Sequence, residues 1–507
     1  MGDVDAAEPE GAELGVVAAG HPWSAQAGAA ALRSGGNAVD AAIASMFAAF
    51  SCEPLLTGLG AGGYMLVVPA SGEPVLLDFF VEAPGRRRSS DARPAALIPV
   101  SVSFGDAVQV FNIGCASVGV WGVPAGAAAA SARFGRMALA ELTGPAAALA
   151  RDGVPLSPEQ AYIVEILGDL VTSTPEAAAL FAPCGTLLTA GEVVRQPELA
   201  DALELLGSEG ADPFYTGEVG AAILAWLQDR GGTVTREDLA AYRVVDREPV
   251  RVSYRGREIL TNPPPSAGGI LIARALTLLE RGPKPASVAA IVSAMEQTQA
   301  ARTPEFLEQL DQPGFGEAFL ASGRLGSTTH VAVLDREGMA CSVTCSNGAS
   351  SGVIVPGTGV HLNNMLGEQD LNPLGFNRHP PGRRLPSMMA PTAVLRADGS
   401  PELVLGSAGS NRIRSAILQT ILRVIDDGLE AGQAVAAPRL HLEDGVVYTE
   451  PGIDSSEIDE TRYQHAPFRA RNLFFGGVQA VEQDDHGRFW GGGDPRRGGA
   501  AVVVSGR

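Results

Sequence analysis

A pair of threonines before an apolar strand is the stretch with the clearest potential for chemistry. Gly326 to His330 gathers small and hydroxyl side chains, and residues 331–335 continue as a run typical of a buried strand. A hydroxyl here can attack a carbonyl only if a base lies beside it. A cut just before Thr328 would supply that base, because the new α-amine would adjoin the hydroxyl. Taken alone, paired threonines at a strand start are also explained by β-propensity.

The elements that must position these threonines alternate between strands and helices. Strand patterns occur upstream of the threonines at residues 15–19, 59–68, 75–80 and 250–260. Gly35-Gly36 is expected to end one helix, and Asn37 to cap the next. From about residue 127 to 320 the pattern is mainly helical, and residues 281–326 are expected to be mobile segments that lead to the threonines. Downstream the chain is β-rich apart from one helix over 412–427, and helical layers flanking sheets predict an α/β sandwich.

Charge and composition exclude several classes of partner. The chain has 507 residues, a formal charge of −20 and a pI of about 4.8, which argues against nucleic acid or an anionic membrane. The one basic cluster, Arg86 to Arg88, is expected to be a solvated loop. No stretch has the apolar length of a membrane span, and the first residues do not resemble a secretory signal. Five cysteines without paired spacing predict neither a disulfide framework nor a zinc site, so a cytoplasmic location is expected.

Several short motifs occur along the chain in one characteristic order. They lie at residues 35–42, 60–66, 123–126, 237–242, 263–269, 328–330, 362–364, 384–392, 406–412 and 494–496. Together they resemble the γ-glutamyltransferase family of N-terminal-nucleophile hydrolases, from about residue 15 to the end of the chain. Each motif alone is weak, and their shared order makes the resemblance specific.

The resemblance implies a precursor that cuts itself between Ser327 and Thr328. Residues 1–327 would form a large chain and 328–507 a small chain, which associate as a heterodimer in one interleaved four-layer αββα sandwich. Thr328 would be the nucleophile and its freed α-amine the base. No metal or organic cofactor is called for, and the substrate would be a small-molecule amide or acyl compound.

The resemblance also implies groups that assist Thr328. Thr344 and Ser346 match the strand that supplies a second hydroxyl, and Ser346 resembles the nearer helper. Gly409 and Ser410 match a Gly-Gly pair whose backbone N–H groups hold the oxyanion. The serine is a departure, although a backbone donor survives a side-chain change if the turn keeps its geometry. His330 is expected to be structural.

The residues that would read a γ-glutamyl group depart from the family. Phe80 stands where the family has an arginine that pairs with the substrate carboxylate, and Met388 replaces one of two hydroxyls, beside Ser387. Glu368 matches the acid that holds the substrate amine, although Gly367 replaces its acidic neighbour. Asn347 is expected in the same pocket.

These departures predict a different or narrower substrate. Removing the charged partner of a buried carboxylate costs roughly 2–5 kcal/mol. An ordinary glutathione-type substrate is therefore expected to bind poorly, unless Arg86 or Arg384 takes the place of the missing arginine. An aromatic or apolar substrate group against Phe80 is one expectation.

Three functions remain open from the sequence. The first is a hydrolase or acyltransferase that uses Thr328 on an amide or similar acyl bond. The second is a pathway-specific hydrolase of antibiotic biosynthesis, because some relatives hydrolyse a C–C bond in 4-alkylproline routes and the Ala-, Gly- and Arg-rich composition suits a high-GC bacterium. The third is an inactive family member that serves as a binding or scaffold protein.

Overall fold

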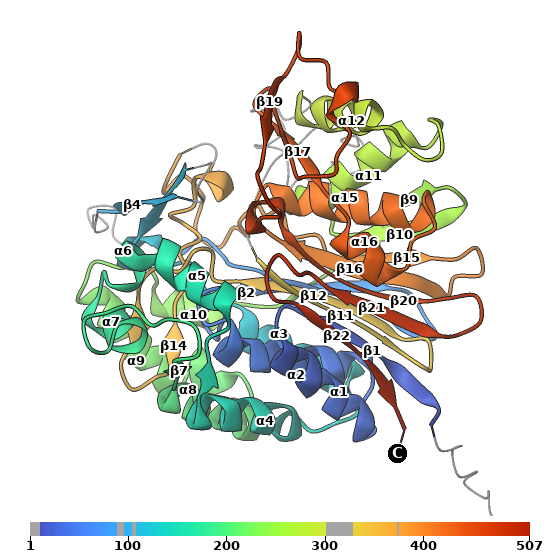
Figure 1. Cartoon of the computed structure of the whole chain (residues 1–507). Helices are drawn as coiled ribbons and strands as arrows, with labels where there is room; N and C mark the ends of the chain where they lie inside the picture. The colour runs from blue at the N-terminus through green and yellow to red at the C-terminus, as the bar shows by residue number, and fades with distance from the viewer. Residues whose placement is uncertain (1–10, 89–95, 104–107, 301–327, 373–374, 507) are drawn as a thin grey trace, which may run out of the picture.

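Two antiparallel sheets face each other at the centre of the molecule (Figure 1). The computed structural model describes residues 11–88, 96–103, 108–300, 328–372 and 375–506. The first sheet has the strand order β22 (Ala500–Ser505), β1 (Glu13–Ala19), β11 (Thr329–Asp335), β12 (Ala340–Ser346), β2 (Gly62–Val68), β3 (Val75–Phe79) and β8 (Val245–Arg247). The second has the order β21 (Phe489–Gly493), β20 (Gly477–Gln483), β16 (Pro401–Ala408), β15 (Thr392–Leu395), β10 (Arg257–Thr261) and β9 (Val250–Tyr254).

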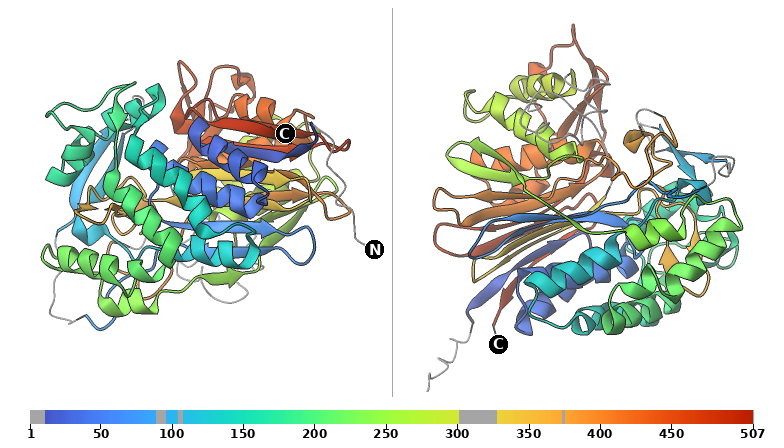
Figure 2. Two further views of the ribbon diagram at one scale, coloured as in Figure 1. Left: turned by 90° about the horizontal axis from the view of Figure 1, so that it is seen from below. Right: turned by 180° about the vertical axis from the view of Figure 1, so that it is seen from behind.

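Helices cover the outer face of each sheet, as the view from behind in Figure 2 shows. The first sheet packs on α1 (Pro22–Arg33), α2 (Ala38–Cys52) and α3 (Val123–Phe134), with α4 (Leu139–Asp152) and α8 (Pro197–Glu209) outside them. The second sheet packs on α11 (Gly268–Leu279), α12 (Val288–Ala300), α15 (Arg412–Ile425) and α16 (Ala431–Ala436).

Smaller elements complete the described chain. The helices are α5 (Pro158–Ile166), α6 (Gly168–Val171), α7 (Pro175–Phe181), α9 (Glu218–Gln228) and α10 (Arg236–Ala241). The strands are β4 (Ile98–Ser103), β5 (Val108–Ile113), β6 (Val154–Pro155), β7 (Val193–Val194), β13 (Ile354–Val355), β14 (Val360–His361), β17 (Leu440–Glu443), β18 (Val446–Thr449) and β19 (Gln464–Pro467). No helix in the described ranges has the length and apolarity needed to cross a membrane.

Strand β11 shows how the layers divide its side chains. Successive side chains of a strand point to opposite faces. Val331 and Val333 pack among the helices of the first sheet, while Ala332 and Leu334 pack between the two sheets. The residues just before them follow the same alternation, so Thr328 and the buried His330 belong to the face between the sheets.

Most of the expected elements are confirmed, with one clear correction. Asn37 caps α2 in a capping box with Asp40, and Gly35 has the left-handed φ of +92° that ends the preceding helix. The first part of residues 281–326 is not the mobile segment that was expected, because helix α12 occupies Val288–Ala300. Its apolar residues pack on the second sheet's helices, a stabilisation that composition alone did not indicate. Residues 301–327, which include Ser327, lie outside the described residues.

Candidate active site

Thr328 lies directly opposite Ser346 at one end of the first sheet. The register of β11 and β12 pairs Thr329 with Cys345 and His330 with Thr344, so the next step opposes Thr328 and Ser346. Both side chains are buried, and Thr328 is 4% exposed. The Ser346 hydroxyl accepts the Gly348 N–H at 2.8 Å, whereas the Thr328 hydroxyl has no hydrogen-bond partner in the described chain. Continued by one residue, the register therefore places the Ser346 hydroxyl on the same face of the sheet as the unpaired Thr328 hydroxyl.

Thr344 and His330 bond to each other on the same face. The Thr344 hydroxyl lies 2.8 Å from Nδ1 of His330, and the Ser342 hydroxyl lies 3.4 Å from Nε2. Burial lowers the pKa of His330 to about 3, so the ring is neutral at ordinary pH. Thr344 supports His330 in this arrangement, and Ser346 is the hydroxyl that faces Thr328.

A turn at the end of β16 brings backbone donors to the same region. Gly406 admits His330 so closely that a Cβ at this glycine would lie 2.4 Å from the ring. Gly409 and Ser410 follow with left-handed φ values of +120° and +57°, and α15 begins at Arg412. The Gly409 N–H has no acceptor in the described part of the chain. A non-glycine residue at positive φ is strained, which is typical of functional turns.

Unsatisfied amides gather on the β12 side of Thr328. Both Asn347 side-chain polar atoms and the Asn364 carbonyl oxygen are buried without a partner. Glu368 accepts the Ala349 N–H at 2.7 Å, and a Cβ at Gly348 would lie 2.1 Å from Asn364 and 2.6 Å from Glu368. Buried polar groups are normally paired, so this cluster suits a polar ligand group. It adjoins Ser346 in the chain.

The other residues expected to read the substrate lie in well-packed surroundings. The Phe80 ring is 1% exposed and stacks on Tyr64 with 5.3 Å between centroids, which leaves little of it open to a substrate group. Met388 is buried in the core of the second sheet, and the Ser387 hydroxyl accepts the Met389 N–H at 3.0 Å. A side chain at Gly367 would meet the Asn112 carbonyl oxygen at 1.9 Å, so the family's acid has no room there.

Neither arginine considered as a replacement for the missing one is available. Arg384 is 7% exposed, pairs with Asp78 at 3.4 Å and donates to the Phe80 carbonyl oxygen. Arg86 pairs with Glu82 at 3.1 Å and is held at its backbone N–H by Asp238, so it does not belong to a freely solvated loop. The suggestion that Arg86 or Arg384 binds a substrate carboxylate is therefore not supported.

Glu53 is a residue of this region that the sequence did not single out. It follows α2, is 2% exposed, and its carboxylate oxygens lie 3.2 and 3.3 Å from the Thr329 hydroxyl. Burial raises the pKa of Glu53 from 4.5 to about 7, although the Thr329 hydrogen bond and the charge of Arg497 oppose this shift. An acidic residue just after a helix is usually predicted to be exposed to solvent. Nothing in the sequence therefore indicated that Glu53 is buried beside Thr329.

Glu53 gives the fold a pH dependence of known sign. Between pH 4.5 and 7 the folded protein holds a proton that the unfolded chain releases, so the free energy of unfolding rises as pH falls. The full effect is about 3 kcal/mol. Glu53→Gln should remove this part, which urea unfolding of both proteins at pH 7.5 and 5.5 measures. Parallel pH dependences in the two proteins would contradict the assignment.

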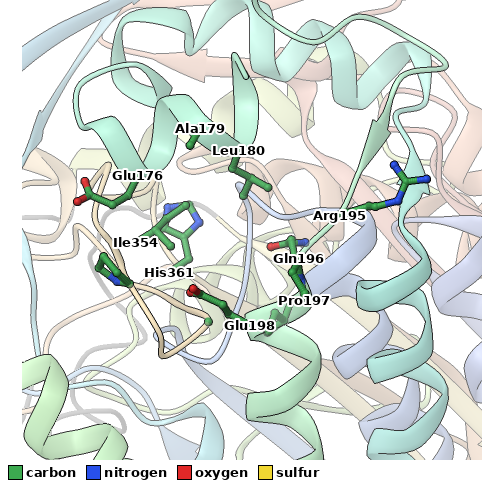
Figure 3. Close-up of a pocket in the computed structure, with 12 residues that line it drawn as sticks. Glu176, Ala179, Leu180, Arg195, Gln196, Pro197, Glu198, Ile354 and His361 are labelled. Carbon is green, nitrogen blue, oxygen red and sulfur yellow. The ribbon is translucent and has the colours of Figure 1, made fainter. Parts of the chain in front are cut away.

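A separate cavity of about 320 Å³ lies between α7, the start of α8 and the β13–β14 pair (Figure 3). None of the predicted site residues lines it. His361 does, but its Nδ1 bonds the Pro54 carbonyl oxygen at 3.0 Å and its Nε2 bonds the Ser350 hydroxyl. Figure 3 shows the Arg195 side chain directed away from His361. Both ring nitrogens are occupied, so the cavity offers no free acid or base from this histidine.

Within the described ranges, no three His, Cys, Asp or Glu residues gather as potential ligands of one metal ion. All five cysteines have free thiols in this structure. Burial raises the pKa of Cys345, which adjoins Ser346, so its thiol is protonated. The polar chemistry of this region therefore rests on hydroxyl, amide and carboxyl groups.

The comparisons with known proteins identify the family. The chain belongs to the gamma-glutamyltranspeptidase family, whose model matches residues 24–315 and 284–504. The acylase ACY 1 proenzyme of Pseudomonas sp. (strain SE83) is 32% identical over 98% of this chain and 95% of its own length. The glutathione hydrolase proenzyme of Bacillus subtilis (strain 168) is 31% identical over 97% of this chain and 92% of its own.

A solved structure agrees with this assignment. Cephalosporin acylase from Bacillus halodurans has a TM-score of 0.81 and 26% identity, and the match covers 100% of this chain and 99% of that protein. The α/β class with antiparallel sheets is thereby confirmed. The relatives named above are hydrolases and acylases, two of them described as proenzymes.

Proposed function

We propose that this protein is a self-cleaving hydrolase or acyltransferase that uses Thr328 as an N-terminal nucleophile on an amide or similar acyl bond. The observation that carries the proposal is the unpaired, buried Thr328 hydroxyl opposite Ser346. Cleavage before Thr328 would yield chains 1–327 and 328–507, held together as a heterodimer in a four-layer αββα sandwich. The proenzyme relatives support a precursor of this kind.

The arrangement assigns a role to each group in the reaction. After self-cleavage the Thr328 α-amine takes the hydroxyl proton as the oxygen attacks the carbonyl carbon. Backbone N–H groups of Gly409 and Ser410 stabilise the negative oxygen of the tetrahedral intermediate. The proton then passes to the departing amine, which leaves an acyl group on Thr328. Water or an acceptor amine releases the acyl group, and the Ser346 hydroxyl orients the threonine oxygen in both halves.

In this proposal the acyl half of the substrate binds beside Asn347. The unsatisfied amides of Asn347 and Asn364, together with Glu368, suit a polar group with hydrogen-bond donors. A substrate carboxylate near Phe80 would have neither Arg384 nor Arg86 as a partner, because both arginines already form salt bridges with acidic side chains of the protein. Ordinary glutathione is therefore a poor substrate in this proposal, and amides without a glutamyl carboxylate are better candidates.

The denaturing mass of freshly purified protein tests this function. Two chains that separate between Ser327 and Thr328 are expected, and amide and acyl compounds should then be screened for turnover. A single intact chain after prolonged incubation would contradict the proposal and favour a binding or scaffold role.

A further inference from the structure

Arg497 is a buried cation that forms no salt bridge within the described residues. It is 9% exposed, and its one hydrogen bond within the described chain runs from Nη2 to the Leu473 carbonyl oxygen at a long 3.4 Å. Its Nε is buried without a partner, and the described residues offer it no salt bridge. Buried charges in proteins are normally paired or bind a ligand.

The acids nearest to Arg497, Asp494 and Glu53, act on its charge from a distance but form no salt bridge with it. Asp494 is already shared by Arg439 at 2.7 Å and Arg496 at 3.2 Å. Glu53 forms no salt bridge with Arg497, and burial raises the pKa of this carboxyl to about 7, so part of it is neutral. Burial and the neighbouring charge of Arg412 lower the pKa of Arg497 to about 10, which still leaves it a cation at neutral pH.

The Arg497 side chain reaches the turn that carries the proposed oxyanion donors. A Cβ at Gly477 would lie 2.2 Å from its Cδ, and one at Gly409 would lie 3.6 Å from its Nη2. Gly477 therefore makes room for the side chain, and the guanidinium is in van der Waals range of Gly409. The guanidinium lies next to a backbone N–H that has no acceptor of its own in the described chain.

The strand order places Arg497 on one side of Thr328 and the amide cluster on the other. Arg497 precedes β22, and β22 and β1 lie on one side of β11 in the first sheet. Asn347 follows β12, on the opposite side of β11 (Figure 1). The strand order of the second sheet gives the same separation of the two sides. Gly477, which contacts Arg497, starts β20 on one side of β16, whereas Met388 precedes β15 on the other side.

We propose that Arg497 binds a carboxylate on the leaving-group half of the substrate, or on the acceptor amine that replaces it. This rests on the proposed function, which places the acyl half beside Asn347. The two halves of an amide extend to either side of the attacked carbonyl carbon, so the half that does not occupy the Asn347 side faces Arg497. A guanidinium fork fits a carboxylate with two parallel hydrogen bonds.

Binding of small aromatic amines tests whether the site recognises the negative charge of a carboxylate or only the shape of the molecule. Isothermal calorimetry on the purified wild-type protein uses 3- and 4-aminobenzoate, with 3- and 4-aminobenzamide as neutral isosteres. We expect at least one aminobenzoate to bind tenfold or more tightly than its amide. Arg497→Met should remove this preference, and Arg497→Lys should restore part of it. The matched control is Arg195→Met, an exposed arginine far from Thr328 in the fold, which should keep the preference.

The outcomes distinguish this inference from the proposed function. A processed protein without any preference for aminobenzoate, or with a preference that survives Arg497→Met, would overturn the role of Arg497 alone. An uncut chain that still prefers aminobenzoate through Arg497 would overturn the function and retain the anion site. An uncut chain without the preference would overturn both.

Thermal unfolding distinguishes a ligand-binding role of Arg497 from a structural one, because the two roles predict different stabilities for Arg497→Met. Removal of an unpaired buried charge is neutral or stabilising, whereas breaking a buried ion pair is destabilising. Arg497→Met should therefore unfold at or above the wild-type temperature. Arg496→Met should unfold at a lower temperature, because Arg496 pairs with Glu450 and Asp494. A marked loss of stability in Arg497→Met would assign Arg497 a structural role and contradict the inference.

Discussion

Thr328→Ala is expected to yield a single uncut chain and to lower turnover by at least a thousandfold. Alanine lacks the hydroxyl that attacks the preceding peptide bond, so neither the new N-terminus nor the acyl-enzyme forms. The substitution removes a hydroxyl that has no hydrogen-bond partner in the described chain, so the fold should be retained. Denaturing mass spectrometry and turnover of the substrate found in the screen measure the two effects.

Two neighbouring variants serve as controls for Thr328→Ala. Thr328→Ser keeps both hydroxyl and α-amine and should still give two chains. Thr329→Ala changes the adjacent hydroxyl, which points to the opposite face and bonds Glu53. This variant should also be cut. Two chains from Thr328→Ala, or an uncut chain from Thr329→Ala alone, would show that the nucleophile lies elsewhere.

The parts of the site that the sequence could predict are those set by local spacing. Thr328 and Ser346 lie together at the open end of a β-hairpin, where β11 begins and β12 ends. The alternation of side chains along the two strands determines which hydroxyls share a face. The turn at Gly409 was likewise marked by small residues between a strand pattern and a helix pattern. The family resemblance assigned roles to the threonine, the serine and the backbone donors, and these local patterns agree with it. The roles stay predictions.

The parts that the sequence could not predict depend on long-range contacts. Glu53 and Arg497 reach the site only because β1, β22 and β11 are neighbours in one sheet, and no local pattern encodes that order. Arg384 was a candidate ligand group until the structure placed it against Asp78 and Glu82. A charged residue reads as solvated in a sequence, so its burial and its partners are known only from the fold.

The same limit applies to Phe80. The family resemblance predicts that Phe80 stands where relatives have an arginine. Its stacking on Tyr64 between the sheets makes it a core residue in this structure, with a backbone carbonyl oxygen that holds Arg384 and Tyr242. In the proposed function, the loss of carboxylate recognition at this position would therefore accompany a change in packing.

Gly409→Ala is expected to lower the turnover number about a hundredfold to a thousandfold, the usual cost of losing one oxyanion donor. Gly409 has a φ of +120°, and an added Cβ would lie 2.6 Å from the Gly476 Cα. The backbone must therefore rotate, which turns the free N–H away from Thr328. Steady-state kinetics should show the loss mainly in kcat, because the donor acts on charge that develops after binding.

Ser410→Gly is the contrasting variant at the same turn. Ser410 already has a left-handed φ of +57°, a conformation that glycine adopts without strain, so the turn should keep its geometry. Because the proposed donor at this position is the backbone N–H, the glycine variant should retain turnover within a few-fold of the wild type. Loss of activity in Ser410→Gly, with full activity in Gly409→Ala, would place the oxyanion donors in side chains and contradict the backbone assignment.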